Sequence, residues 1–228
     1  PQSHAAVIRN HSWKGLNDAP VDVAEAHGLG MVVSAIAEKK IRPQRKMLSA
    51  HQTIVTQVSN AAPALPVAFG LIADDLQQVD QLLAANANVL QEQLQLVGGQ
   101  VEMSVTLQWS TENVFQYFID RYPELASLRD KIATGQASRD EQIACGQMFE
   151  SLLNRERQQH IDRVMEVLGS QCTQFDSQPA RSEKEIMRLA CLIPQSHVDG
   201  FTQAIYQAAQ AFDESFAFAY SGPWPPYS

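Results

Sequence analysis

The chain has few cysteines and no long hydrophobic run. Its 228 residues include three cysteines, Cys145, Cys172 and Cys191, which lie far apart and outside any CxxC spacing. A disulfide scaffold or a zinc site is therefore not expected, and reduced thiols in the cytoplasm fit this pattern better. The longest weakly polar run, residues 61–73, contains two prolines and a glycine and is too short to cross a bilayer as a helix. No segment has the pattern of a signal peptide.

Positive charge is also scarce. The chain has 17 Lys and Arg against 25 Asp and Glu, a net charge of −8. Because this balance repels nucleic acid and anionic lipid, we expect neither as a partner. The exception is one basic stretch, which we interpret as a solvated loop and the first turn of a helix. It consists of Lys39, Lys40, Arg42, Arg45 and Lys46.

The strong signatures of catalysis are missing. There is no HExxH, GxSxG, P-loop or CxxC motif. Gly28-Leu29-Gly30 is a GxG fragment, but it precedes a predicted strand where a dinucleotide motif would follow one, so these are expected to be turn glycines. The histidines His51 and His160 stand singly on predicted helices, where an exposed or core histidine is the simpler interpretation.

The remaining reactive groups have structural explanations as well. Asp74 and Asp75 could bind a metal, but an acidic helix start accounts for both residues without a ligand. Cys191 lies between apolar residues in a predicted strand, where a thiol is usually inert packing. We therefore expect no catalytic residue, no cofactor and no metal.

What the sequence does contain is enough apolar material for a core, with 45% hydrophobic and 18% charged residues. The clearest pattern in the first half is a stripe at helical spacing that begins after Asp75 and ends at Gly98-Gly99. The other assignments there are a loop over residues 1–28 with a short strand near Ala5–Ile8, a strand at 31–36, a helix at 43–59 and a strand at 65–71.

The second half opens with strict alternation, because Val101, Met103, Val105, Leu107 and Trp109 share one face of a half-buried strand. Further along, the pattern predicts helices at 110–133, broken or bent by Pro123, at 139–168 and at 197–212, and strands at 172–178, 187–194 and 215–221. Within the second of these helices, the polar stretch 154–160 is expected to project past the core or to pair with a neighbouring helix.

From residue 101 the order is strand, helical insertion, helix, strand, strand, helix, strand. This is the βαββαβ order of a ferredoxin-like sheet packed on two helices, with an extra inserted helix. The predicted fold class is therefore α+β with two domains. The first is an N-terminal α/β domain at 1–99, and the second, at 100–228, is the modified ferredoxin-like domain.

Four segments in this order resemble the gas vesicle protein family GvpL/GvpF. They are LPVAFG at 65–70, VEMSVTLQW at 101–109, LACLIP at 189–194 and FAYSGPWPPYS at 218–228. The last is the most specific, because GPWPPYS matches the closing motif of many family members nearly letter for letter. Family members often have a basic residue at the position of Ala68 and a lysine at that of Thr106.

The resemblance implies a cytoplasmic, vesicle-associated accessory protein of gas vesicle assembly without enzymatic activity. Its implied partners are the shell protein GvpA and other accessory proteins, in a chaperone-like or nucleating role. The alternatives are a minor structural component of the vesicle and a small-ligand-binding or enzymatic ferredoxin-like domain. The candidates for structural or partner contacts are Phe69, Trp109, Phe216, Phe218, Tyr220, Trp224, Pro225, Pro226 and Tyr227.

The closing motif is interpreted as an ordered strap. Its three prolines are expected to stop the last strand and to lower the entropy cost of docking. Trp224 and Tyr227 would then pack back on the body. On this interpretation Trp224→Ala lowers stability before it weakens a partner contact.

Overall fold

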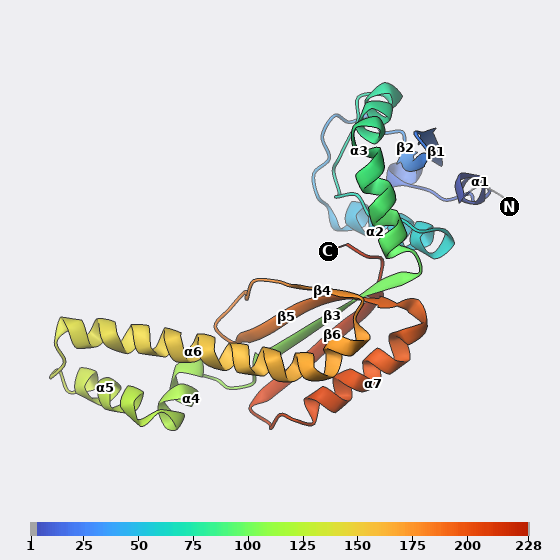
Figure 1. Ribbon diagram of the computed structural model, residues 1–228. Helices are drawn as coiled ribbons and strands as arrows, with labels where there is room; N and C mark the ends of the chain where they lie inside the picture. Colours follow the sequence, from blue (N-terminus) through green and yellow to red (C-terminus); the bar gives the residue numbers. More distant parts are fainter. Residues whose placement is uncertain (1–3, 228) are drawn as a thin grey trace. The chain divides into compact units, whose positions relative to one another are not determined.

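The computed structural model describes residues 4–227, which form an α+β protein of seven α-helices, a two-stranded sheet and a four-stranded antiparallel sheet (Figure 1). The chain divides into two compact units. Unit 1 is Pro1–Glu102 together with Pro223–Ser228, and unit 2 is Met103–Gly222. The closing residues of the chain therefore belong to the same unit as its first hundred.

Unit 1 is built around a hairpin. Its two-residue turn has positive φ at both positions, 54° at His27 and 75° at Gly28, which is the turn geometry that matches the twist of paired strands. Gly28 is thus a turn glycine, as its sequence context predicted, whereas Gly30, which was expected to be one as well, lies in strand β2 opposite Glu25. The elements of the unit are α1 (His4–Arg9), β1 (Val21–Ala26), β2 (Leu29–Ser34), α2 (Arg45–Ala61) and α3 (Leu76–Val97).

Two small apolar clusters hold unit 1 together. One joins α1, β1 and α2, and the other joins β2 to α3. The predicted helix after Asp75 is confirmed, and the Asp75 side chain caps it by accepting a hydrogen bond from the Gln78 N–H. The buried residues are Ala5, Ile8, Val23 and Val58 in the first cluster and Leu29, Val79 and Leu83 in the second.

Two strand predictions in unit 1 were wrong. Residues 4–9 are a helix, because Ala5 and Ile8 at i, i+3 spacing bury one helical face. Residues 65–71 form a loop, since Pro66 has no N–H for a ladder and Gly70 adopts φ of 92°. A third element, β1, was missed because its apolar residues alternate with acids in a stretch interpreted as a loop.

Unit 2 contains the four-stranded sheet, with α6 and α7 against one face (Figure 1). Its strand order is β4-β5-β3-β6. The second half of the sequence is mostly as predicted, including the break at Pro123, which starts a new helix at its first position. The elements are β3 (Gln100–Trp109), α4 (Val114–Arg121), α5 (Pro123–Ala133), α6 (Arg139–Leu168), β4 (Gln174–Ser177), β5 (Glu185–Pro194), α7 (Val198–Ala209) and β6 (Phe216–Trp224).

The alternation in β3 is confirmed, because Met103, Val105 and Leu107 are almost fully buried. The prediction that the prolines end the last strand at Ser221 needs correction. β6 continues through Pro223 to Trp224. Since β6 is an edge strand of the sheet, a proline can occupy it without breaking a ladder bond on the open side.

The polar stretch 154–160 of α6 does not project past the core. Its Arg157 donates from Nε to the carbonyl of Glu185 and from Nη2 to the carbonyls of Ser182 and Glu183. The guanidinium thus satisfies three backbone acceptors of the loop before β5. This part of α6 therefore fixes the position of the loop through hydrogen bonds from Arg157.

Glu185 is the one buried acid among the described residues. Both carboxylate oxygens accept hydrogen bonds from Arg188, each 3.0 Å long, and the backbone N–H of Arg181 adds another. The bonds from Arg188, followed by the one from Arg181, lower the pKa of Glu185 below its usual range. The charged form of this acid therefore stabilises the folded state.

We expect Glu185→Gln to lower the free energy of unfolding by about 1.5–3 kcal/mol at neutral pH, the range for hydrogen bonds to charged groups. Because the folded pKa is depressed, this contribution is present above about pH 4.3 and is lost as pH falls through the folded pKa. Denaturant unfolding at several pH values should therefore show that the free energy of unfolding falls less on acidification in the variant than in the wild type. Glu183→Gln, at an exposed neighbouring position, should leave the wild-type profile unchanged.

Candidate functional site

The C-terminal strap, residues 223–227, is bonded to the body of unit 1. The Tyr227 hydroxyl donates a hydrogen bond of 3.1 Å to the carbonyl of Val67, and the Tyr227 N–H donates one of 2.8 Å to Glu102. Pro225 and Pro226, between Trp224 and Tyr227, are buried. The two segments with the most distinctive sequences, LPVAFG and GPWPPYS, thus meet in space.

The acceptor of the Tyr227 bond is shared with α2. His51 lies with Nε2 3.0 Å from the same Val67 carbonyl, and its ring packs edge-on against Phe69 at 5.7 Å between centroids. Leu48 precedes His51 by one turn on the same face of α2. The carbonyl of Val67 therefore ties together the strap, the loop and the helix.

The side chains around this junction are apolar and open to solvent. Val67 is 39% exposed, Leu71 65% and Trp224 46%. Large apolar side chains that stay this accessible are common at interaction sites, so these are candidates for partner contact. We define the strap surface as Leu48, Val67, Phe69, Leu71, Trp224 and Tyr227.

In unit 2 the aromatic residues form a cluster beneath α6. Trp109, 1% exposed, contacts Phe118 edge-on at 5.5 Å. The half-buried Phe216 contacts Tyr117 directly at 6.4 Å, and the half-buried Phe218 joins through Phe212 at 5.2 Å. Buried aromatics at these distances and angles stabilise packing. This group is therefore the core of unit 2 rather than an open binding site.

His160 lies inside this cluster, 4.7 Å from the Phe216 ring. Its Nε2 is 3.4 Å from the Glu156 carboxylate, within ion-pair reach but outside hydrogen-bond geometry, and Tyr122 donates its hydroxyl to the other oxygen of that acid. The contact with His160, and then the Tyr122 bond, lower the pKa of Glu156. Burial, and then the Glu156 bond, raise the pKa of Tyr122.

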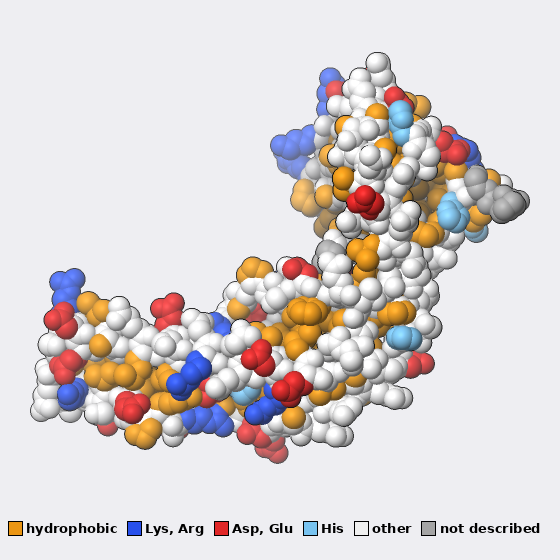
Figure 2. Space-filling view, viewed as in Figure 1, with side chains coloured by type: hydrophobic (Ala, Val, Ile, Leu, Met, Phe, Trp, Pro, Cys, Tyr) orange, Lys and Arg blue, Asp and Glu red, His pale blue; other side chains and the backbone are white. Residues whose placement is uncertain are grey.

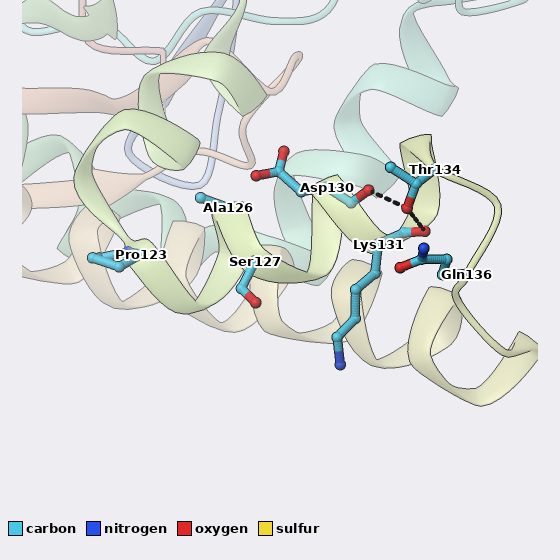
Figure 3. A pocket seen from close by; sticks show the side chains of 7 residues that line it. All are labelled: Pro123, Ala126, Ser127, Asp130, Lys131, Thr134 and Gln136. Carbon is cyan, nitrogen blue, oxygen red and sulfur yellow. Dashed lines mark hydrogen bonds between the residues drawn. The ribbon is translucent and has the colours of Figure 1, made fainter.

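A shallow pocket of about 490 Å³ lies along α5 (Figure 3). Its polar groups are bonded locally, since the Thr134 hydroxyl donates to the carbonyls of Asp130 and Lys131. The Lys131 ammonium is paired with Glu141 at 3.0 Å. These side chains come from one helix and the turn after it, so no set of groups converges on a bound molecule.

Residues 4–227 contain no group of three or more His, Cys, Asp or Glu side chains that is arranged to hold a metal ion. None of the helices in that range has a stretch long and apolar enough to cross a bilayer.

The sequence-predicted contact residues thus fall into two groups. Phe69, Trp224, Pro225, Pro226 and Tyr227 belong to unit 1 at or beside the strap surface, and Trp109, Phe216, Phe218 and Tyr220 belong to unit 2. Sequence reasoning missed His51, Leu48 and Leu71 as parts of the same surface. Residues 65–71 were predicted as a strand with Leu71 on its apolar face. Leu71 was therefore expected to be buried and was not considered as an exposed contact residue.

Comparison with known proteins finds one family along nearly the whole chain. The family model "Gas vesicle synthesis protein GvpL/GvpF" matches residues 2–228. Gas vesicle protein F of a Streptomyces species is 26% identical over 99% of this chain and 94% of that protein, and gas vesicle protein L1 of Halobacterium salinarum is 23% identical over 95% and 83%.

Two solved structures have the same fold. Gas vesicle protein GvpF of an Anabaena species superposes with a TM-score of 0.85 at 26% identity, covering 96% of this chain and 91% of that one. GvpF of Microcystis aeruginosa gives 0.83 at 24% identity, covering 94% and 90%. With a family model that spans nearly every residue and a fold that matches throughout, the chain belongs to the GvpL/GvpF family of gas vesicle proteins.

Proposed function

We propose that this protein is an accessory factor of gas vesicle assembly that holds the shell protein GvpA, and other accessory proteins, through exposed apolar surface. The observation that carries the proposal is the strap surface, where Val67, Leu71 and Trp224 stay open to solvent on the loop and the strap that the bond from Tyr227 to Val67 joins. A rigid apolar surface keeps the ordering cost of binding low. A chaperone-like or nucleating partner of an aggregation-prone subunit needs such a surface.

The absence of a catalytic role is part of the same proposal. Membership of a gas vesicle family supports a role in vesicle formation, and the Thr134 hydroxyl and the Lys131 ammonium in the pocket along α5 are already engaged in local bonds. We further propose that unit 2 is a modified ferredoxin-like domain. Its strand order β4-β5-β3-β6 is that of a βαββαβ sheet, and α4 and α5 form the insertion.

The test is binding of GvpA by a variant in which the open apolar groups are removed. We expect V67S/L71S/W224S to lose at least about ten-fold in affinity with little change in melting temperature, because exposed substitutions usually have small effects on stability. Because Trp224 is 46% exposed, we propose that its substitution weakens binding before it lowers stability, the reverse of the order expected from the sequence. A light-scattering assay of GvpA aggregation gives the readout.

A matched control removes equally exposed apolar groups from unit 2. Ile143, Phe175 and Tyr206 are 50%, 51% and 59% exposed, and their triple serine variant should bind GvpA as the wild type does. If the wild type neither binds GvpA nor slows its aggregation, the direct role is contradicted. Retention of the chain on urea-washed vesicles would favour the alternative of a minor structural component.

A further inference from the structure

The basic stretch before α2 is a concentrated patch of positive charge on an acidic protein. Its five cations at positions 39–46 are all exposed, and only Glu38 adjoins them. None of the ion pairs or side-chain hydrogen bonds found among residues 4–227 involves them. In Figure 2, Lys and Arg side chains gather at the margin of unit 1 where the loop before α2 runs. The basic patch is Lys39, Lys40, Arg42, Arg45 and Lys46.

The patch does not help the fold. Arg45 and Lys46 occupy the first turn of α2, where the helix dipole disfavours positive charge. No acid lies in that turn, and Gln44 at the N-cap provides no side-chain bond. The five positive charges repel one another, and two of them also repel the positive end of the α2 dipole. They therefore do not stabilise the folded chain, and a binding partner explains them better.

The patch leads directly to the strap surface. Arg45 and Leu48 are three residues apart on α2, and Leu48 is followed by His51, which contacts the Val67 carbonyl. The exposed fraction of Leu48 is 43%. Positive charge and open apolar side chains therefore follow one another along a single face of α2.

We infer that the basic patch and the strap surface together dock an acidic segment of a protein partner, a stretch of clustered Asp or Glu followed by apolar residues. The inference rests on the proposed function for the identity of that partner. The basic patch attracts the Asp and Glu residues of the segment, and Leu48 and Val67 contact its apolar residues. Nucleic acid and anionic bilayers fit less well, because the net charge of −8 repels extended polyanions while a short segment meets only the local field.

The first test uses a probe that is independent of any vesicle protein. A fluorescent peptide of four glutamates followed by four leucine and valine residues should bind the full-length protein, and its affinity should fall as salt rises from about 0.05 M to about 0.5 M. K39E/K40E/R42E should weaken binding by about ten-fold or more. K14E/R139E/K184E makes the same change in net charge at exposed positions outside the patch and should bind within about two-fold of the wild type.

Three results overturn the inference: no binding of the peptide by the wild type, equal binding by K39E/K40E/R42E, or tighter binding of a short DNA duplex or of anionic vesicles than of the peptide. The second test repeats the comparison with GvpA and the other vesicle proteins. If both the wild type and the variant retain the same vesicle proteins equally, the patch is not their docking site. If neither the wild type nor the variant retains any vesicle protein, the proposed function fails. The peptide result still shows whether the patch binds acidic segments.

Discussion

Replacing Trp109 by alanine is expected to lower the free energy of unfolding of unit 2 by about 3–5 kcal/mol, the largest effect of any single substitution considered. Trp109 is 1% exposed and packs against Phe118, Tyr117 and His160 at 5.5, 6.4 and 6.5 Å between ring centroids. Its loss removes a large apolar surface and leaves a cavity at the end of β3. The surrounding rings come from different elements, so they cannot close the gap without moving.

The measurement is denaturant unfolding, with hydrogen exchange of the α6 and β5 amides to assign the loss to unit 2. Phe175→Ala is the matched control, because that ring is 51% exposed on the edge strand β4 and should cost less than about 0.5 kcal/mol. Equal losses in the two variants would contradict the placement of Trp109 at the centre of the core.

The elements predicted best from the sequence are those with one face packed against the protein and the other face more open to solvent. β3 alternates because one face of the sheet meets helices, and α3 shows its stripe because one face meets the hairpin. Pro123 and Asp75 mark helix starts through local chemistry that operates in any context.

The failures arise where distant contacts decide the structure. The alternation of residues 65–71 has no partner strand, and the loop is instead fixed by His51 and Tyr227 from elsewhere in the chain. The sequence around Val67 gives no sign of its bonds to His51 and Tyr227, and neither do the sequences around those two residues. In α6, Arg157 looks like part of a solvated face until the carbonyls it satisfies are known. Local patterns therefore predicted the elements, while the candidate site depends on tertiary hydrogen bonds that no local pattern contains.

Truncation after Gly222 should weaken unit 1 although it removes only the end of the chain. Pro225 and Pro226 are buried, each with three methylenes worth about 0.8 kcal/mol apiece as an upper bound, and Tyr227 makes two hydrogen bonds worth about 1 kcal/mol each. Ordering the strap offsets about half of this, and the prolines reduce that cost. The expected net loss is about 2–4 kcal/mol.

Hydrogen exchange of α2 is the direct readout, because Val67 is tied to His51 and the strap through one carbonyl. Tyr227→Phe removes only the hydroxyl bond and should cost about 0.5–1.5 kcal/mol, and Trp224→Ala should cost less because that side chain is half exposed. A truncated chain with wild-type exchange in α2 would show that the strap is not needed for unit 1. The opposite result, a graded loss across the three variants, would show that the strap holds the loop at residues 65–71 and α2 in place.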